Sequence, residues 1–216
     1  MAKNKSYPAY RIFRFILGPI FRLWYNPKII NKEVIPKEGP ILVVGNHKHI
    51  MDQCSVIIST KRTLNYMAKK EYFDGKFAWF FKIGGCISVD REAHDGVAKE
   101  QAMEILNNGG AIGLFPEGTR IKTKEKLLLD FKYGTVSMAD KCNATIVPYA
   151  ITGDYKFRSK NLMVRFGKPF KVEDGDLEKA NKKLRKVIED LIDENLKATN
   201  RTVKEEMESH MEEKKS

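Results

Sequence analysis

The chain has 216 residues, a length that suits one globular domain with a small appendage. Hydrophobic residues make up 42% of it, and that share excludes wholesale disorder. The formal net charge of +11 indicates an anionic partner, namely nucleic acid, anionic lipid, a phosphorylated substrate or an acidic carrier protein. The three cysteines, Cys54, Cys86 and Cys142, are odd in number and widely spaced, which fits a reducing compartment and neither a disulfide framework nor a CxxC zinc site.

Residues 1–26 are predicted to form an N-terminal amphipathic segment. Arg11, Arg14 and Arg22 fall at helical spacing on one side of residues 10–25, aromatic and aliphatic side chains cover much of the rest, and Pro19 predicts a kink. Such a helix can lie in the lipid interface with its guanidinium groups at phosphates, or it can pack on the protein's own core. No run reaches the ~18 apolar residues of a spanning helix, and no small-residue cleavage site follows the basic start, so we expect peripheral membrane attachment and no cleavable signal.

Predicted strands and helices alternate along residues 27–200. Apolar runs predict strands at 41–44, 64–67, 87–89, 111–115, 145–151 and 162–166, and the helical pattern predicts helices at 52–62, 71–82, 97–106, 134–141 and 177–196. This alternation is typical of an α/β fold, so we expect a single mixed-sheet domain flanked by helices. Residues 201–216 are charged and poor in core residues, and we expect this tail to fray.

The sharpest feature is a histidine and an aspartate directly after the predicted strand 41–44. His47 and Asp52 are separated by four residues in the run Asn46-His47-Lys48-His49-Ile50-Met51-Asp52. A turn of this length can bring the carboxylate to one imidazole nitrogen and leave the other for a substrate. The alternatives are a structural histidine and a metal site with His49, the second being weak because no other histidine has metal-ligand spacing.

Other charged residues stand where predicted strands end. The run Phe115-Pro116-Glu117-Gly118-Thr119-Arg120 follows one buried strand, and Arg120 can hold a phosphate through two donors while Gly118 permits close backbone approach. The simpler alternative is an ordinary loop with a Glu117–Arg120 ion pair. Arg91 ends the run Gly85-Cys86-Ile87-Ser88-Val89-Asp90-Arg91, and Pro148 lies in the predicted strand 145–151.

Taken in order, these runs resemble the glycerolipid acyltransferase family that includes the bacterial 1-acyl-glycerol-3-phosphate acyltransferases. The family pattern NHxxxxD, GxIxVxR, FPEGTR and a final strand containing Val-Pro is matched across residues 28–167, and the ordered set is far more specific than any one motif. His49 and Ile121 depart from the pattern, because many relatives have serine at both positions.

The resemblance implies an activity and a set of roles. The family transfers a fatty acyl group from acyl-CoA or acyl carrier protein to lysophosphatidic acid, giving phosphatidic acid in phospholipid biosynthesis, without a metal or an organic cofactor. His47 would be the general base and Asp52 its orienting partner. The glycerol phosphate would be held by Lys70, with Lys69 as an alternative, and by Arg91, Glu117, Gly118 and Arg120. The protein would act as a peripheral, monotopic enzyme on an anionic membrane surface, at the cytoplasmic face of the cell membrane.

Several alternatives stay open at this point. The acceptor can be glycerol-3-phosphate or another lysophospholipid. A more distant alternative is a basic nucleic-acid-binding module, but the sequence has no RNP-like, helix-turn-helix or zinc-finger pattern, so we expect no nucleic acid partner. A lipid-binding protein without catalysis is disfavoured by the presence of both His47 and Asp52. The aromatic run at residues 77–81 can line an acyl slot, touch lipid or pack in the core.

Overall fold

Seven strands form one sheet in the order β1-β7-β6-β2-β5-β3-β4. The computed structural model describes residues 7–76, 78–90 and 96–210. All neighbouring strands pair in parallel except β6 and β7, which are antiparallel, so the predicted mixed sheet is confirmed. The strands are β1 (Lys28–Ile30), β2 (Ile41–Gly45), β3 (Leu64–Lys69), β4 (Ile87–Val89), β5 (Ala111–Leu114), β6 (Thr145–Thr152) and β7 (Met163–Phe166).

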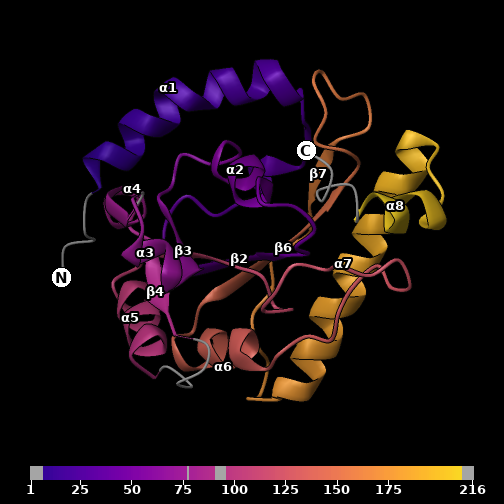
Figure 1. The fold of residues 1–216 in the computed structure, drawn as a ribbon. Coiled ribbons are helices and arrows are strands. Elements are labelled where there is room, and N and C mark those ends of the chain that lie inside the picture. The colour runs from indigo at the N-terminus through magenta and orange to yellow at the C-terminus, as the bar shows by residue number, and fades with distance from the viewer. Residues whose placement is uncertain (1–6, 77, 91–95, 211–216) are drawn as a thin grey trace.

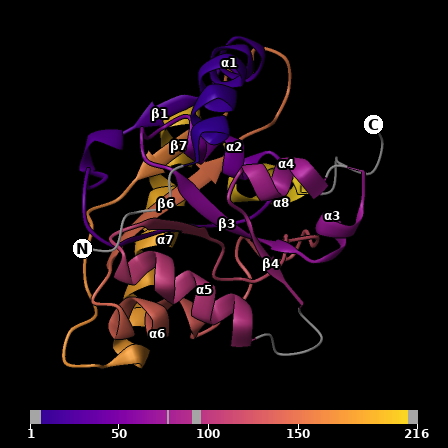
Figure 2. The ribbon, with the colours of Figure 1, turned by 90° about the vertical axis from the view of Figure 1, so that its left-hand side faces the viewer.

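Helices cover both faces of the sheet, as Figures 1 and 2 show. On one face α5, α6 and α7 bury Leu106, Val136 and Leu184 against the strands, and on the other face α2 buries Val56. Because both faces are covered, the central strand β2 is apolar and buried along its whole length. The helices are α1 (Pro8–Tyr25), α2 (Asp52–Ile57), α3 (Glu71–Asp74), α4 (Ala78–Ile83), α5 (Gly96–Asn107), α6 (Gly134–Lys141), α7 (Leu177–Thr199) and α8 (Val203–Ser209), with a 3-10 turn at Lys32–Val34.

Most predicted elements lie where the patterns placed them, and the differences have local causes. The helix expected at 71–82 is two short helices, α3 and α4, because the backbone at Gly75 is extended. The helix expected at 52–62 ends at Ile57. The edge strand β1 was not predicted, since Lys-Ile-Ile is too short to show a strand pattern.

The charged tail differs most from its expectation. Instead of fraying, residues 203–209 form α8, which Figure 1 shows beside the C-terminal end of α7. Asn200 ends α7 in the left-handed conformation, and Thr202 then caps α8 in a capping box with Glu205. The Thr-x-x-Glu spacing is the sequence signal that marks this helix start. Residues 211–216 lie outside the described part of the chain.

Arg14 and Arg22 of α1 contact the protein itself, whereas the lipid-interface prediction placed these guanidinium groups at lipid phosphates. Arg22 donates to the carbonyl of Ile58 at 2.7 Å, and Arg14 donates to the carbonyl of Thr60. These carbonyls follow α2, where cationic groups are favoured by the helix dipole and by unpaired acceptors. The apolar side is left exposed, with Phe15 81% and Leu23 69% exposed. Within the described residues, no helix has both the length and the apolar character needed to cross a bilayer.

Candidate active site

The loops after β2 and β5 form the site, because these strands are parallel neighbours and end at the same edge of the sheet. Val44 pairs with Leu114, so His47 and Glu117 follow the two strands at similar distances. In open α/β sheets, ligands bind at this carboxyl edge. The loops are joined by a hydrogen bond from the backbone N–H of Ile121 to the carbonyl of His47 at 2.8 Å.

Asn46, the residue before His47, anchors the loop that follows β2. The side-chain amide of Asn46 donates to the carbonyl of Ile151 at 2.8 Å and accepts from the N–H of Ile151 at 2.8 Å. The residue therefore extends the pairing of β2 with β6 by one step. The ring of His47 then stacks on Phe115, with 3.8 Å between centroids and 11° between planes. Both contacts restrict where the imidazole can point.

The structure brings His47 and Asp52 together. Nδ1 of His47 lies 2.9 Å from Oδ2 of Asp52, whose side chain is fully buried. A carboxylate at Nδ1 favours the tautomer in which Nδ1 carries the proton, which leaves Nε2 as the acceptor that a general base needs. His47 itself lines a pocket of about 490 Å³, so the imidazole is accessible to a substrate.

Asp52 is fixed by three further donors. Its Oδ2 accepts from the backbone N–H of Lys48 at 2.8 Å and of His49 at 2.7 Å, and its Oδ1 accepts from the hydroxyl of Tyr155 at 3.0 Å. Tyr155 lies between β6 and β7, 103 residues along the chain, and stacks on His49 at 4.2 Å. Sequence reasoning missed Tyr155, because no local pattern links it to the first motif.

Glu117, on the loop after β5, is only 3% exposed. Its Oε1 accepts from the backbone N–H of His47 at 2.9 Å, and its Oε2 accepts from the N–H of Leu129 at 2.7 Å. Burial raises the pKa of Glu117 to about 7, although these two N–H groups act in the opposite direction. The carboxyl group thus ties the loop after β5 to the backbone of His47, and its expected contact with glycerol phosphate stays a prediction.

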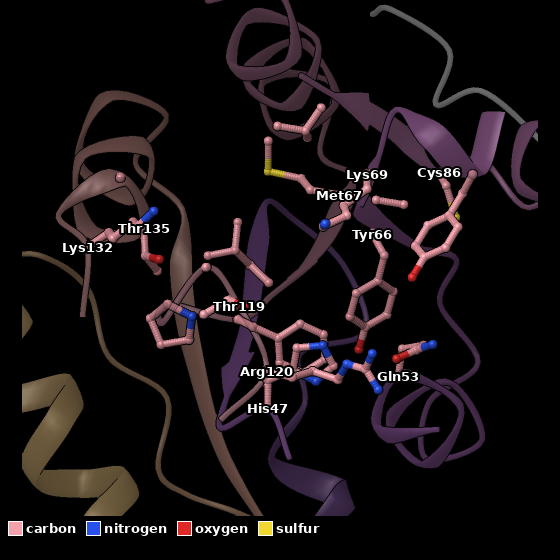
Figure 3. A pocket seen from close by; sticks show the side chains of 18 of the residues that line it. His47, Gln53, Tyr66, Met67, Lys69, Cys86, Thr119, Arg120, Lys132 and Thr135 are labelled. Carbon is pink, nitrogen blue, oxygen red and sulfur yellow. The ribbon is translucent and has the colours of Figure 1, made fainter. Parts of the chain in front are cut away.

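The other predicted site residues are placed differently around the pocket (Figure 3). Gly118 and Arg120 line it, and Gly118 has φ +71°, a conformation that side chains rarely adopt. Lys69, the alternative to Lys70, also lines the pocket. Lys70 instead lies 3.3 Å from Asp90, in an exposed ion pair. Arg91 lies outside the described residues.

The pocket combines positive charge with an apolar wall. Of the described residues that line it, Arg120 and four lysines are cationic and one, Asp90, is acidic. This balance suits a phosphorylated ligand. The lysines are Lys69, Lys99, Lys122 and Lys132, and the apolar side chains include those of Ile50, Tyr66, Met67, Phe81, Val89, Leu114, Phe115 and Met138. From the aromatic run at 77–81, Phe81 lines the pocket, whereas Trp79 and Phe80 are exposed and Phe77 is outside the described residues.

Comparisons with known proteins find relatives among the acyltransferases. The chain is 32% identical over 160 residues to a probable 1-acyl-sn-glycerol-3-phosphate acyltransferase of Mycoplasma pneumoniae, a match that covers 69% of this chain and 56% of the relative. It is 31% identical over 146 residues to a 1-acyl-sn-glycerol-3-phosphate acyltransferase of Bacillus subtilis, covering 67% of this chain and 71% of that one. The chain thus spans little more than half the length of the Mycoplasma relative.

The fold also has a solved counterpart. The crystal structure of the 1-acyl-sn-glycerophosphate acyltransferase PlsC from Thermotoga maritima superposes with a TM-score of 0.64 at 21% identity, covering 87% of this chain and 88% of that one. A family model described as Acyltransferase matches residues 26–152, which include His47, Asp52 and the run Phe115-Pro116-Glu117-Gly118-Thr119-Arg120. The chain therefore belongs to the acyltransferase family.

Proposed function

We propose that this protein transfers a fatty acyl group from an acyl thioester to the free hydroxyl of 1-acyl-glycerol-3-phosphate, forming phosphatidic acid for phospholipid biosynthesis. The observation that carries the proposal is the hydrogen bond between His47 and the buried Asp52 at a pocket with excess positive charge. The names of the relatives from M. pneumoniae and B. subtilis support the same reaction.

The reaction needs one base and no covalent intermediate. Nε2 of neutral His47 removes the proton from the acceptor hydroxyl as its oxygen attacks the thioester carbon, and Asp52 stabilises the imidazolium that forms. The C–S bond breaks, the C–O bond forms, and the proton passes to the departing thiolate. General base catalysis contributes about 10²- to 10⁴-fold, so the fixed geometry of the two motif loops must supply further acceleration.

The basic residues of the pocket would hold the acceptor's phosphate. Arg120 and Gly118, on the loop after β5, line the pocket, and Lys69 or Lys70 would add a charge from the end of β3. Arg91 and Glu117 complete the proposed set. Acyl-CoA and acyl carrier protein are both anionic donors, so the positive charge suits either, and glycerol-3-phosphate or another lysophospholipid is the second candidate acceptor.

Mass spectrometry of the products tests the proposal. Purified protein is given a panel of lysolipids and glycerol-3-phosphate with each donor type. We expect phosphatidic acid from lysophosphatidate, and a loss of about 10²- to 10⁴-fold in kcat for His47→Ala and Asp52→Asn with fold and melting temperature checked beside it. Unchanged turnover by folded His47→Ala would refute the mechanism. A covalently acylated protein trapped during turnover would favour a two-step scheme instead.

We further propose that the exposed apolar side of α1 lies on the cytoplasmic face of the cell membrane. Phe13 joins α1 to α4 through Phe80, with ring centroids 5.6 Å apart, and Trp24 joins it to Phe157 at 4.9 Å. The exposed apolar surface is therefore continuous. It consists of Ile12, Phe15, Ile16, Leu17, Ile20, Leu23 and Trp24 of α1, Trp79, Phe80 and Ile83 of α4, and Phe157. Lysophosphatidate is itself a membrane lipid. An enzyme bound to the membrane surface through α1 would therefore meet its acceptor there.

Liposome flotation tests this surface. A fully buried Phe or Leu side chain contributes about 1.5–3 kcal/mol, so Phe15→Asn combined with Leu23→Asn should greatly reduce flotation with anionic liposomes. Binding should largely survive high salt, because Arg14 and Arg22 are engaged with carbonyls of the protein. Lys204→Asn, on the exposed side of α8, is the matched control. Undiminished flotation of the double variant would contradict the proposal.

A further inference from the structure

Lys48, which directly follows His47, is a buried cation with its own set of partners. Its side chain is 4% exposed, and Nζ donates to the carbonyl of Gly153 at 2.7 Å, to Oγ of Ser209 at 3.0 Å and to the carboxylate of Glu206. Glu206 is 2% exposed and belongs to α8, 158 residues along the chain. A buried ammonium without such partners would be strongly unfavourable, so α8 is required to keep the charge of Lys48 in this place.

Two further charged residues, Arg201 and Asp154, extend this ion pair into a network. Oε2 of Glu206 accepts from the N–H of Gly153 at 3.0 Å and lies 3.6 Å from Nε of Arg201. Nη1 of Arg201 lies 3.0 Å from Oδ1 of Asp154. Two cations and two carboxylates therefore join α8 to the segment between β6 and β7, which also carries Tyr155.

Helix α8 reaches the loop after β5 as well. The buried His210, at the end of α8, lies beside the backbone of Thr123, three residues after Arg120. One short helix thus contacts the segments that follow His47 and Arg120, and these segments are already joined by the hydrogen bond between Ile121 and His47.

We propose that Lys48 and Glu206 form a latch by which α8 positions the His47–Asp52 pair, which makes Lys48 a positioning residue of the reaction. The backbone N–H of Lys48 donates to Oδ2 of Asp52, the oxygen that faces Nδ1 of His47. When α8 holds the Lys48 side chain, it therefore also holds the peptide group that orients the carboxylate. Outer partners of this kind keep a reacting group in its productive geometry, and small displacements are costly in rate. The inference rests on the proposed acyl transfer.

The test compares four full-length variants under the conditions of the product assay. Lys48→Met removes the cation of the pair and leaves Glu206 to Arg201, whereas Glu206→Gln leaves the buried charge of Lys48 without its carboxylate. The double variant removes both charges of the pair, and Glu208→Gln changes an exposed carboxylate on the same helix. All are measured well below the lowest melting temperature, with folding checked by circular dichroism. We expect kcat to fall about 10- to 100-fold in the two single variants and in the double variant, while KM for lysophosphatidate changes little and Glu208→Gln matches the wild type.

The double variant separates positioning from charge balance. If the ion pair served stability alone, removing both charges would return kcat to the wild-type value, and the latch would be refuted. A wild-type kcat in folded Lys48→Met would refute it too. A low kcat in the folded double variant supports it. Absence of acyl transfer in the wild-type protein would instead contradict the proposed function itself, so the two failures are distinct.

Discussion

Replacing Glu117 by Gln should remove a pH-dependent part of the folding free energy. The side chain is buried, and its two oxygens accept from the backbone N–H groups of His47 and Leu129 at 2.9 and 2.7 Å. Burial raises the pKa of this carboxyl group to about 7 from an ordinary value of 4.5. Gln keeps the size and most of the shape of the side chain but cannot titrate.

The sign follows from proton binding in the two states. Between pH 4.5 and about 7 the folded chain keeps a proton on Glu117 that the unfolded chain has released. The stability from this group is therefore fully present below pH 4.5 and is lost as the pH rises through about 7. A difference of about 2.5 in pKa corresponds to about 3 kcal/mol in the free energy of unfolding.

Urea unfolding of the wild type and Glu117→Gln at a series of pH values measures this term. The wild type should lose about 3 kcal/mol relative to the variant between about pH 4.5 and pH 8. Other titrating groups, such as His210 whose pKa is lowered by burial, are common to both proteins and cancel in the difference. A difference that stays constant with pH would refute the reasoning, because it would mean that the carboxyl group ionises near its ordinary value.

Three further changes probe the site. Arg120→Ala should raise KM for a phosphorylated acceptor and affect a neutral acceptor much less, as steady-state kinetics with both would reveal, and equal losses would count against phosphate binding. Tyr155→Phe removes one hydrogen bond to Asp52. A hydrogen bond to a charged group contributes about 1.5–3 kcal/mol, so kcat should fall by roughly 10- to 150-fold at most. A wild-type kcat would show that Tyr155 does not orient Asp52. Gly45→Ala would place a Cβ atom 2.3 Å from the ring of Tyr149. Thermal unfolding should therefore detect a destabilisation of about 1–3 kcal/mol or more. An unchanged melting temperature would show that the ring can move.

Local patterns were sufficient for six of the seven strands and for the contact between His47 and Asp52. The apolar run at residues 41–44 and the run before Phe115 predicted the two strands whose ends form the site, since buried parallel strands are continuous apolar segments. The pairing of His47 with Asp52 was also predictable, because a turn with four intervening residues can bring the two side chains within hydrogen-bonding distance.

Long-range partners decided the rest. The sequence contained Lys48, Tyr155 and Glu206 but no pattern that joined them, because contacts over 103 and 158 residues depend on which strands and helices become neighbours. The inward side of α1 was likewise settled by the carbonyls that follow α2. Composition alone made the tail look like a solvated run of charges, and only the folded chain supplied the buried lysine that pairs with Glu206 and holds α8 in place.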